Sequence, residues 1–452
     1  MTWELQLARM AHAVRYEDLP PELVEHTKTL LLDTLGCALG AVGCPPAKAL
    51  TRAASSAWPG GGPATLLGSS ERASAEVATL LNGTLIRYLD FNDIYEGLEP
   101  IHPSENIAAA IACCEEAGAG GKRLVEAIVA GYEAHIRFSR AYAFIKRGLH
   151  PVSAAGWVAP LIAGKAWGMD PESIAHGIAL SGARTQTLTV ISRGDIGMAK
   201  ATGYAFPSMD GVFAARVARE GFTGPVAAMQ WLFDKVQPPQ ADPSFEVDLD
   251  SYRMLGVSLK RFPVQFELQS VVEACVQLAG PLRGRHEQIA RIEVGTYRKV
   301  IDRAADRSKY EPTTRETADH SLPVCAALAL ADGRLDAGQF DRDRWKDADI
   351  RRLMACTEAH IDDELLQRFP KGRGARVTVT LRDGSTHSRL VEIPEGDHAR
   401  PLAAAQVQAK FMEQAVCAIG TSRAERVIHE VAALERASSL QPLLSQMGAT
   451  LH

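Results

Sequence analysis

Residues 89–106 read Leu-Asp-Phe-Asn-Asp-Ile-Tyr-Glu-Gly-Leu-Glu-Pro-Ile-His-Pro-Ser-Glu-Asn, a polar segment between two apolar ones. Asp90 and Asp93 are followed by His102, a proline and Ser104, and an Ile/Ala run then begins a helix. A residue before proline avoids the α region, and serine is a favoured N-cap. We therefore expect His102 to lie in extended backbone just outside a helix N-terminus, where amide donors favour an anionic ligand.

A second segment repeats this arrangement. Residues 147–157 read Arg-Gly-Leu-His-Pro-Val-Ser-Ala-Ala-Gly-Trp, so His150 precedes a proline and Ser153 can cap the alanine-rich helix that follows. The next polar, glycine-broken segment is predicted to be a loop carrying Arg193 and Lys200. Two histidine–proline loops that each open a helix of small residues are unusual, and they suggest a paired site.

The spacing of apolar residues predicts the fold class. Helical spacing dominates the first half of the chain and returns after residue 397. Between them, residues 289–297 alternate like a strand, and residues 375–381 and 387–393 flank an Arg-Asp-Gly-Ser hairpin turn. This pattern predicts a mainly α protein, with a large all-helical domain built from both chain ends (1–265 and 397–452) and an inserted smaller α+β unit (266–396).

Composition narrows the class of function. The chain has 452 residues, is 46% hydrophobic and carries a net charge of -5 without any Lys/Arg run, which argues against nucleic acid as a partner. No apolar run of 18 residues exists and the N-terminus lacks signal-peptide features, so no membrane partner is expected. Eight scattered cysteines without a Cys-x-x-Cys motif are interpreted as reduced thiols of a cytoplasmic protein.

Several common chemistries lack their motifs. The chain has no GxxxxGK[ST], GxGxxG, HExxH or GxSxG sequence, and its cysteines do not offer an iron–sulfur ligand set. We therefore expect acid/base chemistry that uses neither a metal nor a cofactor.

Short motifs in order along nearly the whole chain resemble those of the MmgE/PrpD family, which includes 2-methylcitrate dehydratase, cis-aconitate decarboxylase and iminodisuccinate epimerase. They are Leu-Leu-Asp-Thr-Leu-Gly (31–36), Asn-Gly-Thr (82–84), Leu-Asp-Phe-Asn-Asp (89–93), His-Pro-Ser (102–104), Gly-Leu-His-Pro (148–151), Gly-Phe-Thr-Gly-Pro (221–225), Lys-Arg-Phe-Pro (260–263) and Arg-Glu-Thr-Ala-Asp-His-Ser-Leu-Pro (315–323). The resemblance implies a homodimer, an α+β lid domain and a metal-free site between the domains. Its site positions map to Asp90, His102, His150, Lys200 and Lys260.

The chemistry of these side chains fits polycarboxylate substrates. Removing a proton α to a carboxylate builds negative charge, which fixed cations such as Lys200 and Lys260 would stabilise. Histidine is the natural acid or base near neutral pH, so His102 and His150 are candidates for either role. Asp90 could orient a histidine or act as an acid. Arg193, Asp93 and His320 are further candidates for substrate binding.

Four departures from the family pattern bear on the reaction. Two extra residues separate Asp90 from His102 compared with the decarboxylase branch. Ile94 stands where the decarboxylase branch has threonine, Gly203 where many relatives have histidine, and Val324 where several have tyrosine. We therefore predict a cofactor-independent lyase most like 2-methylcitrate dehydratase. The alternatives are an epimerase or isomerase of a dicarboxylate, a cis-aconitate-type decarboxylase, and a non-catalytic carboxylate-binding protein.

Overall fold

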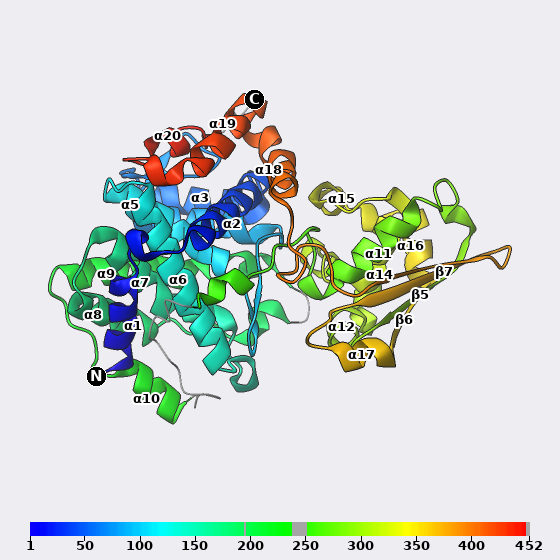
Figure 1. Cartoon of the computed structure of the whole chain (residues 1–452), viewed down its shortest axis with the longest axis horizontal. Helices are drawn as coiled ribbons and strands as arrows, with labels where there is room; N and C mark the ends of the chain where they lie inside the picture. Colours follow the sequence, from blue (N-terminus) through cyan, green and yellow to red (C-terminus); the bar gives the residue numbers. More distant parts are fainter. Residues whose placement is uncertain (194–195, 237–250, 449–452) are drawn as a thin grey trace.

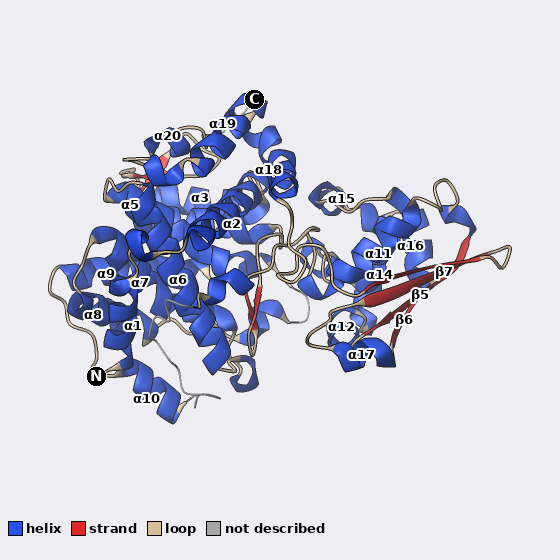
Figure 2. Cartoon of the chain, in the orientation of Figure 1, coloured by secondary structure: helices blue, strands red, loops and turns tan. Residues whose placement is uncertain are grey.

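The computed structural model describes residues 1–193, 196–236 and 251–448. Helices dominate these residues, and Figure 2 shows that the strands are few and short. The mainly α class is therefore confirmed. Buried apolar side chains form two separate clusters, one among the helices of both chain ends and one among residues 262–391. The proposed boundaries between domains stay a prediction.

The larger cluster lies among helices from both ends of the chain (Figure 1). The first-half helices are α1 (Trp3–Ala13), α2 (Pro21–Gly40), α3 (Pro45–Ala57), α4 (Ala75–Tyr88), α5 (Ile107–Glu116), α6 (Gly121–Ala141), α7 (Ala155–Trp167), α8 (Pro171–Gly182), α9 (Ala205–Arg219) and α10 (Ala228–Lys235). The C-terminal helices are α18 (Ala404–Ile419), α19 (Thr421–Ala432) and α20 (Gln441–Leu444). Two short hairpins, β1 (Ala64–Thr65) with β2 (Arg72–Ala73) and β3 (Tyr95–Glu96) with β4 (Pro100–Ile101), lie in the same part of the chain.

Helix α18 packs against α2, which joins the two chain ends. A Cβ atom on Gly36 would lie 3.2 Å from Phe411, so a small residue is needed at this approach. Lys410 crosses the same contact, with Nζ 2.7 Å from Oδ1 of the buried Asp33. A residue near the end of the chain is thereby fixed to one near its beginning.

The second cluster lies between helices and a four-stranded sheet, at the right of Figure 1. The sheet has the order β6-β5-β7-β8, in which only the β5–β6 pair is parallel. Its strands are β5 (Ile289–Thr296), β6 (Thr357–Ile361), β7 (Ala375–Leu381) and β8 (Thr386–Val391). The helices are α11 (Gln269–Ala279), α12 (Arg298–Ala304), α13 (Arg315–Ala318), α14 (Leu322–Asp332), α15 (Ala337–Asp341), α16 (Ala348–Ala355) and α17 (Asp363–Arg368). The predicted hairpin between β7 and β8 is confirmed, with Gly384 at a φ of +83° in its turn.

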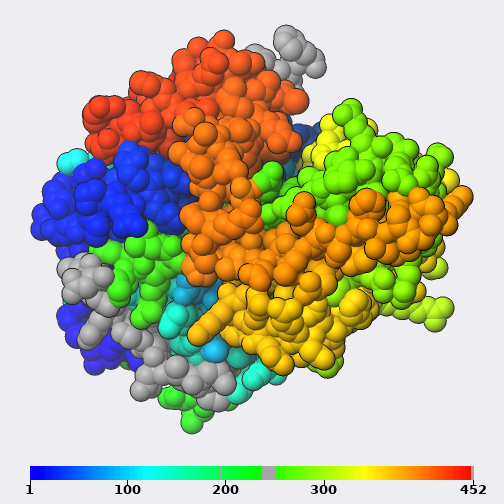
Figure 3. Space-filling model, turned by 45° about the vertical axis from the view of Figure 1, so that its right-hand side comes forward, coloured from blue at the N-terminus to red at the C-terminus, as the bar shows by residue number. Residues whose placement is uncertain are grey.

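Two antiparallel segments connect the clusters. The outgoing residues 258–264 run beside the returning residues 393–400, and the amide of Leu259 donates to the carbonyl of Gly396 at 2.8 Å. A Cβ atom on Gly396 would lie 2.2 Å from the carbonyl oxygen of Leu259, and the φ of Gly396 is +96°. Only glycine therefore fits where the two segments cross. The space-filling view shows the returning segment in orange, running from one part of the molecule to the other (Figure 3).

The expected serine caps are wrong in detail. Ser104 and Ser153 lie inside short 3-10 turns, Pro103–Asn106 and Pro151–Ala154, that precede α5 and α7. Proline at the first position of each turn starts the structure without a serine cap. The two hydroxyls bind neighbouring loops instead, Ser104 to the Asp93 carboxylate and Ser153 to the Thr187 backbone.

Within the described ranges, no single helix has the length and hydropathy needed to cross a membrane. Helices α2 and α3 would do so only as a pair, and they are bent by 85° relative to each other.

Candidate active site

Seven of the eight residues singled out from the sequence line one cavity of about 360 Å³. They come from distant parts of the chain and include every predicted catalytic residue. The seven are Asp90, His102, His150, Arg193, Lys200, Lys260 and His320. The sequence therefore located the wall of one cavity from segments more than 200 residues apart.

Asp90 is the centre of a buried charge cluster. It follows the end of α4 in left-handed backbone, with a φ of 51°, a conformation that aspartate tolerates better than most residues. Its Oδ1 lies 2.6 Å from Arg87 and 2.8 Å from Lys260, and its Oδ2 lies 3.3 Å from Lys200. Burial alone would raise the pKa of Asp90, but these three cations hold it well below its usual range. Asp90 is thus an ionised carboxylate that binds three cationic side chains.

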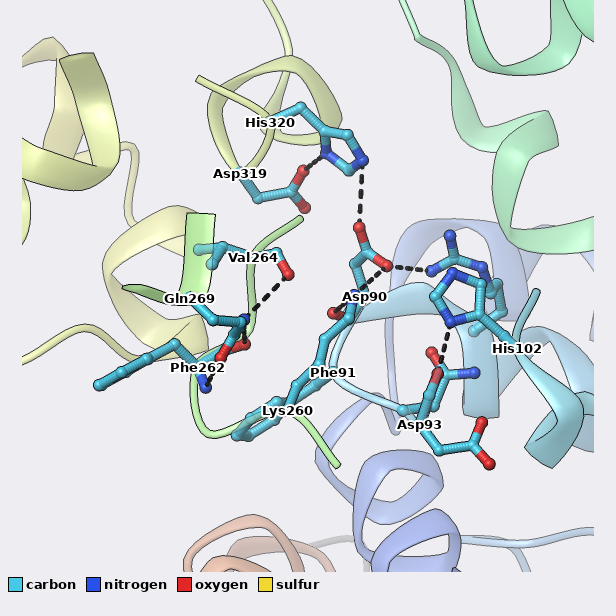
Figure 4. A network of polar contacts seen from close by, with 12 residues as sticks. Asp90, Phe91, Asp93, His102, Lys260, Phe262, Val264, Gln269, Asp319 and His320 are labelled. Atoms are coloured by element: carbon cyan, nitrogen blue, oxygen red, sulfur yellow. Dashed lines mark hydrogen bonds and ion pairs between the residues drawn. The ribbon is translucent and has the colours of Figure 1, made fainter. Parts of the chain in front are cut away.

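His320 joins this cluster from the other side of the cavity. Its Nε2 lies 3.1 Å from Oδ2 of Asp90 and 2.9 Å from Nζ of Lys200, and Figure 4 shows its ring between Asp90 and Asp319. Nδ1 of His320 is bound to Asp319, and Asp319 is held by Arg315 at 3.2 Å. Nδ1 faces the Asp319 carboxylate and therefore carries a proton, while Nε2 lies between the Asp90 carboxylate and the Lys200 ammonium.

His102 presents one defined nitrogen to the cavity. It directly precedes the 3-10 turn, with a φ of -114° and a ψ of 85°, so the predicted placement outside a helical turn is confirmed. Its Nδ1 lies 2.6 Å from the backbone carbonyl of Asp93 (Figure 4). A carbonyl only accepts, so Nδ1 donates its proton and Nε2 keeps a free lone pair. Burial, together with Arg87 and Lys260, lowers the pKa of His102 well below its usual value.

His150 has the opposite tautomer. Its backbone amide donates to Thr187 at 2.7 Å, and its Nδ1 accepts from the backbone amide of Val152 at 3.3 Å. The proton of a neutral ring then resides on Nε2. Burial lowers the pKa of His150 to about 3, so the ring is neutral at pH 7. The cavity therefore holds one imidazole that accepts and one that donates.

Asp93 is the one predicted site residue that the structure does not bring to the cavity wall. Its Oδ1 accepts from the amide and hydroxyl of Ser104, and its Oδ2 accepts from the Tyr132 hydroxyl at 2.9 Å. Burial raises its pKa to about 6. Asp93 therefore lies behind His102, where it positions the loop that holds the histidine.

Backbone contacts hold Lys260 in place. The amide and carbonyl of Ile94 pair with those of Ser258, both at 2.8 Å, which brings the lysine segment to the Asp90 loop. Gln269, the first residue of α11, binds the backbone of the Lys260–Pro263 turn (Figure 4). Nζ of Lys410 donates to the carbonyls of Phe91 and Lys260, both at 2.9 Å.

Some cavity residues carried no recognisable sequence signal. Lys309, Gln265 and Arg303 also line the cavity, but they lie in ordinary polar stretches of the sequence. Arg87 had a usable signal, because it is a lone charge near the end of an apolar helix, three residues before Asp90.

Three of these groups could in principle bind a metal ion. Ligand atoms of Asp90, Asp319 and His320 lie within 4.8 Å of one another. Both oxygens of Asp90 already contact cationic side chains, and Nδ1 of His320 is bound to Asp319. A divalent ion would have to displace ammonium groups, so this arrangement suits a charge network better than a metal site.

Two protein-family domains and several known proteins match the sequence of this chain. The MmgE/PrpD N-terminal domain matches residues 5–246, and the MmgE/PrpD C-terminal domain matches residues 262–436. The chain is 28% identical to the 2-methylcitrate dehydratase of Cupriavidus necator over 422 residues, which covers 86% of this chain and 85% of that protein.

Two fungal proteins match over nearly their whole length. The cis-aconitate decarboxylase-like protein oryM of Aspergillus oryzae is 23% identical over 482 residues, with 99% and 97% of the two chains covered. The cis-aconitate decarboxylase of Aspergillus terreus is 22% identical over 476 residues, with 97% and 94% covered. With both domain matches together spanning most of its length, the chain belongs to the MmgE/PrpD family.

Proposed function

We propose that this protein is a cofactor-independent lyase that removes water from a hydroxylated di- or tricarboxylate, most like 2-methylcitrate dehydratase. Nε2 of His102 takes the proton α to a carboxylate. Nε2–H of the neutral His150 donates a hydrogen bond to the leaving hydroxyl, which departs as water with the proton that His102 has taken. The observation that carries the proposal is the pair of opposite imidazole tautomers in one cavity. β-Elimination needs one group that accepts the α proton and one that stabilises the leaving hydroxyl by donating a hydrogen bond.

The cations around Asp90 suit the charge that this reaction develops. Lys200 and Lys260 line the cavity, and an enolate-like state beside them would be stabilised electrostatically. A bound polycarboxylate would also oppose the cations that depress the pKa of His102, which strengthens the imidazole as a base in the complex.

Two residues favour dehydration over decarboxylation. Ile94 and Gly203 both line the cavity, at positions where the family resemblance leads one to expect threonine and histidine. Ile94 is apolar and Gly203 has no side chain, so both positions lack the polar group expected there. The cavity keeps the two histidines, but it lacks the threonine of the decarboxylase branch and the histidine that many relatives have.

Proton NMR in D₂O would test the proposal on 2-methylcitrate, citrate, cis-aconitate and several dicarboxylates. Loss of water from a hydroxylated acid is the expected result. Deuterium exchange without net reaction would instead indicate an epimerase, and release of carbon dioxide from cis-aconitate a decarboxylase. No reaction or exchange with any of these acids would overturn the enzymatic proposal.

Variants would connect the reaction to the cavity. His102→Ala and Lys260→Ala are each expected to lower kcat at least 100-fold while the circular dichroism spectrum is unchanged. Near-normal rates in both variants would contradict the proposed site. Lys122→Ala is a suitable control, because this lysine is exposed on the helical part and lies outside the cavity.

We also propose that the protein is a cytoplasmic homodimer in which residues 266–396 act as a lid. All eight cysteines are free and six are buried, which supports a reducing compartment. Helix α9 exposes Phe206 and Phe213 by 45% and 52%, and their spacing of seven residues places them on one helix face. An exposed aromatic face of this kind supports a subunit interface.

A further inference from the structure

Lys309 is a buried cation in the cavity wall. It belongs to the 3-10 turn Arg307–Tyr310 and is 7% exposed. Across the described part of the chain, its ammonium has no hydrogen-bond or ion-pair partner. Burying an ammonium group without a partner lowers the stability of the folded protein. The presence of lysine at this position therefore needs an explanation.

Four other cations of the cavity wall are neutralised by carboxylates. Arg87, Lys200 and Lys260 share the carboxylate of Asp90. Arg303 lies 3.0 Å from Glu267. Lys309 therefore differs from them in having its charge available to a ligand.

Gln265 and Lys309 each contact a residue next to His320 in the sequence. The amide of Gln265 donates to the carbonyl of Asp319 at 3.1 Å, and the hydroxyl of Ser321 donates to the carbonyl of Lys309. Lys309 and Gln265 thus flank His320, and both line the cavity. Gln265 is 9% exposed, and its buried Oε1 has no hydrogen-bond partner. An amide oxygen only accepts, so this unpartnered atom is a second, independent sign of a missing donor such as a substrate hydroxyl.

We propose that Lys309 and Gln265 form a subsite for a carboxylate of the substrate that does not react. The ammonium binds the carboxylate, and Oε1 of Gln265 accepts a hydrogen bond from a neighbouring hydroxyl of the substrate. The inference rests on the proposed function and deepens it, since it assigns the residues that select a polycarboxylate. Lys309 thereby acts in binding rather than in proton transfer.

Equilibrium binding of citrate, tricarballylate and succinate, measured by calorimetry, tests the subsite. Lys309→Met should weaken binding of a polycarboxylate that the wild-type protein binds by about 10- to 100-fold, as expected for a lost charge-assisted hydrogen bond. Lys309→Arg should restore most of the affinity. Lys346→Met is the matched control, because Lys346 is exposed and paired with Asp343 outside the cavity.

Two further readouts separate binding from structure. Lys309→Met should raise KM more than it changes kcat, because the lost contact is remote from the reacting carbon. The melting temperature of the unliganded variant should equal or exceed that of the wild type, because an unpaired buried charge is removed. A marked fall in melting temperature would assign Lys309 to the fold and overturn the subsite.

The outcomes of these experiments separate the subsite proposal from the lyase proposal. Wild-type affinity in Lys309→Met would overturn the subsite and leave the lyase proposal standing. If the wild-type protein bound none of the three acids and turned over no polycarboxylate, both proposals would be wrong.

Discussion

Glu105 is a buried carboxyl directly behind the cavity. Burial raises its pKa to about 8, although Nε of Arg87 lies 3.6 Å away and opposes the shift. Its other oxygen, Oε2, is buried without a hydrogen-bond partner, which agrees with a neutral carboxyl at pH 7. Its position three residues after His102 places this group under the loop that holds the proposed base.

The raised pKa of Glu105 predicts that the free energy of unfolding depends on pH. The folded pKa of about 8 exceeds the ordinary value of 4.5, so between these pH values the folded state binds more protons than the unfolded state. The free energy of unfolding should therefore fall as pH rises from 4.5 to 8. Glu105→Gln should remove this loss and be more stable than the wild type by about 1–3 kcal/mol at pH 9, with little difference at pH 4.

Urea unfolding at pH 4, 7 and 9 measures the effect. Glu425→Gln serves as a control, because Glu425 is exposed on α19. If the free energies of unfolding of Glu105→Gln and the wild type changed in parallel with pH, the raised pKa of Glu105 would be contradicted.

At this scale, sequence reasoning succeeded where a residue had a distinctive neighbourhood. His102 and His150 each precede a proline and a helix of small residues, and the structure places both in one cavity. Lys309 and Gln265 have no such context, because their importance arises from burial without a partner. Burial of this kind depends on tertiary packing and leaves no local pattern.

Among the elements, α18 has a role beyond packing. Lys410 on this helix is 8% exposed, pairs with Asp33 and binds two backbone carbonyls at the cavity. Lys410→Met would leave Asp33 buried and unpaired, and should lower the free energy of unfolding by about 3 kcal/mol. The Asp33→Asn/Lys410→Met double variant should recover much of this loss, which urea denaturation would measure. Wild-type stability of the single variant would argue against the pairing.

The elements were predicted best where a periodic pattern was long. Strand β7 matches the expected segment 375–381. Strand β6 was missed, because it is an edge strand with mostly half-buried or exposed side chains and therefore shows little alternation.

For the whole molecule, the exposed aromatic face of α9 yields a test of the proposed dimer. A Phe206→Lys/Phe213→Lys variant should elute as a monomer, because two charges would be desolvated in the interface. Size-exclusion chromatography with light scattering measures the mass. Trp58→Lys is the control, since Trp58 is 55% exposed on a different helix end. A dimeric double variant would place the interface elsewhere.

The change in pattern near residues 266 and 397 led to the predicted domain boundaries, which stay a prediction. Helical spacing before and after these points agrees with the apolar cluster that both chain ends share. The crossing of residues 258–264 and 393–400 was not predictable, because it depends on Gly396 and on backbone hydrogen bonds between distant segments.

Lys410 reaches the carbonyl of Phe91 across 319 residues of sequence. The ribosome synthesises the chain from its N-terminus, so Asp90, His102, Lys200 and Lys260 all emerge before Lys410, which holds the Asp90 and Lys260 segments. The growing polypeptide should consequently stay inactive until α18 has been synthesised and has docked on α2. Catalytic competence would then report completion of synthesis, and a protease cut within α18 would silence an enzyme whose reacting groups are all still present.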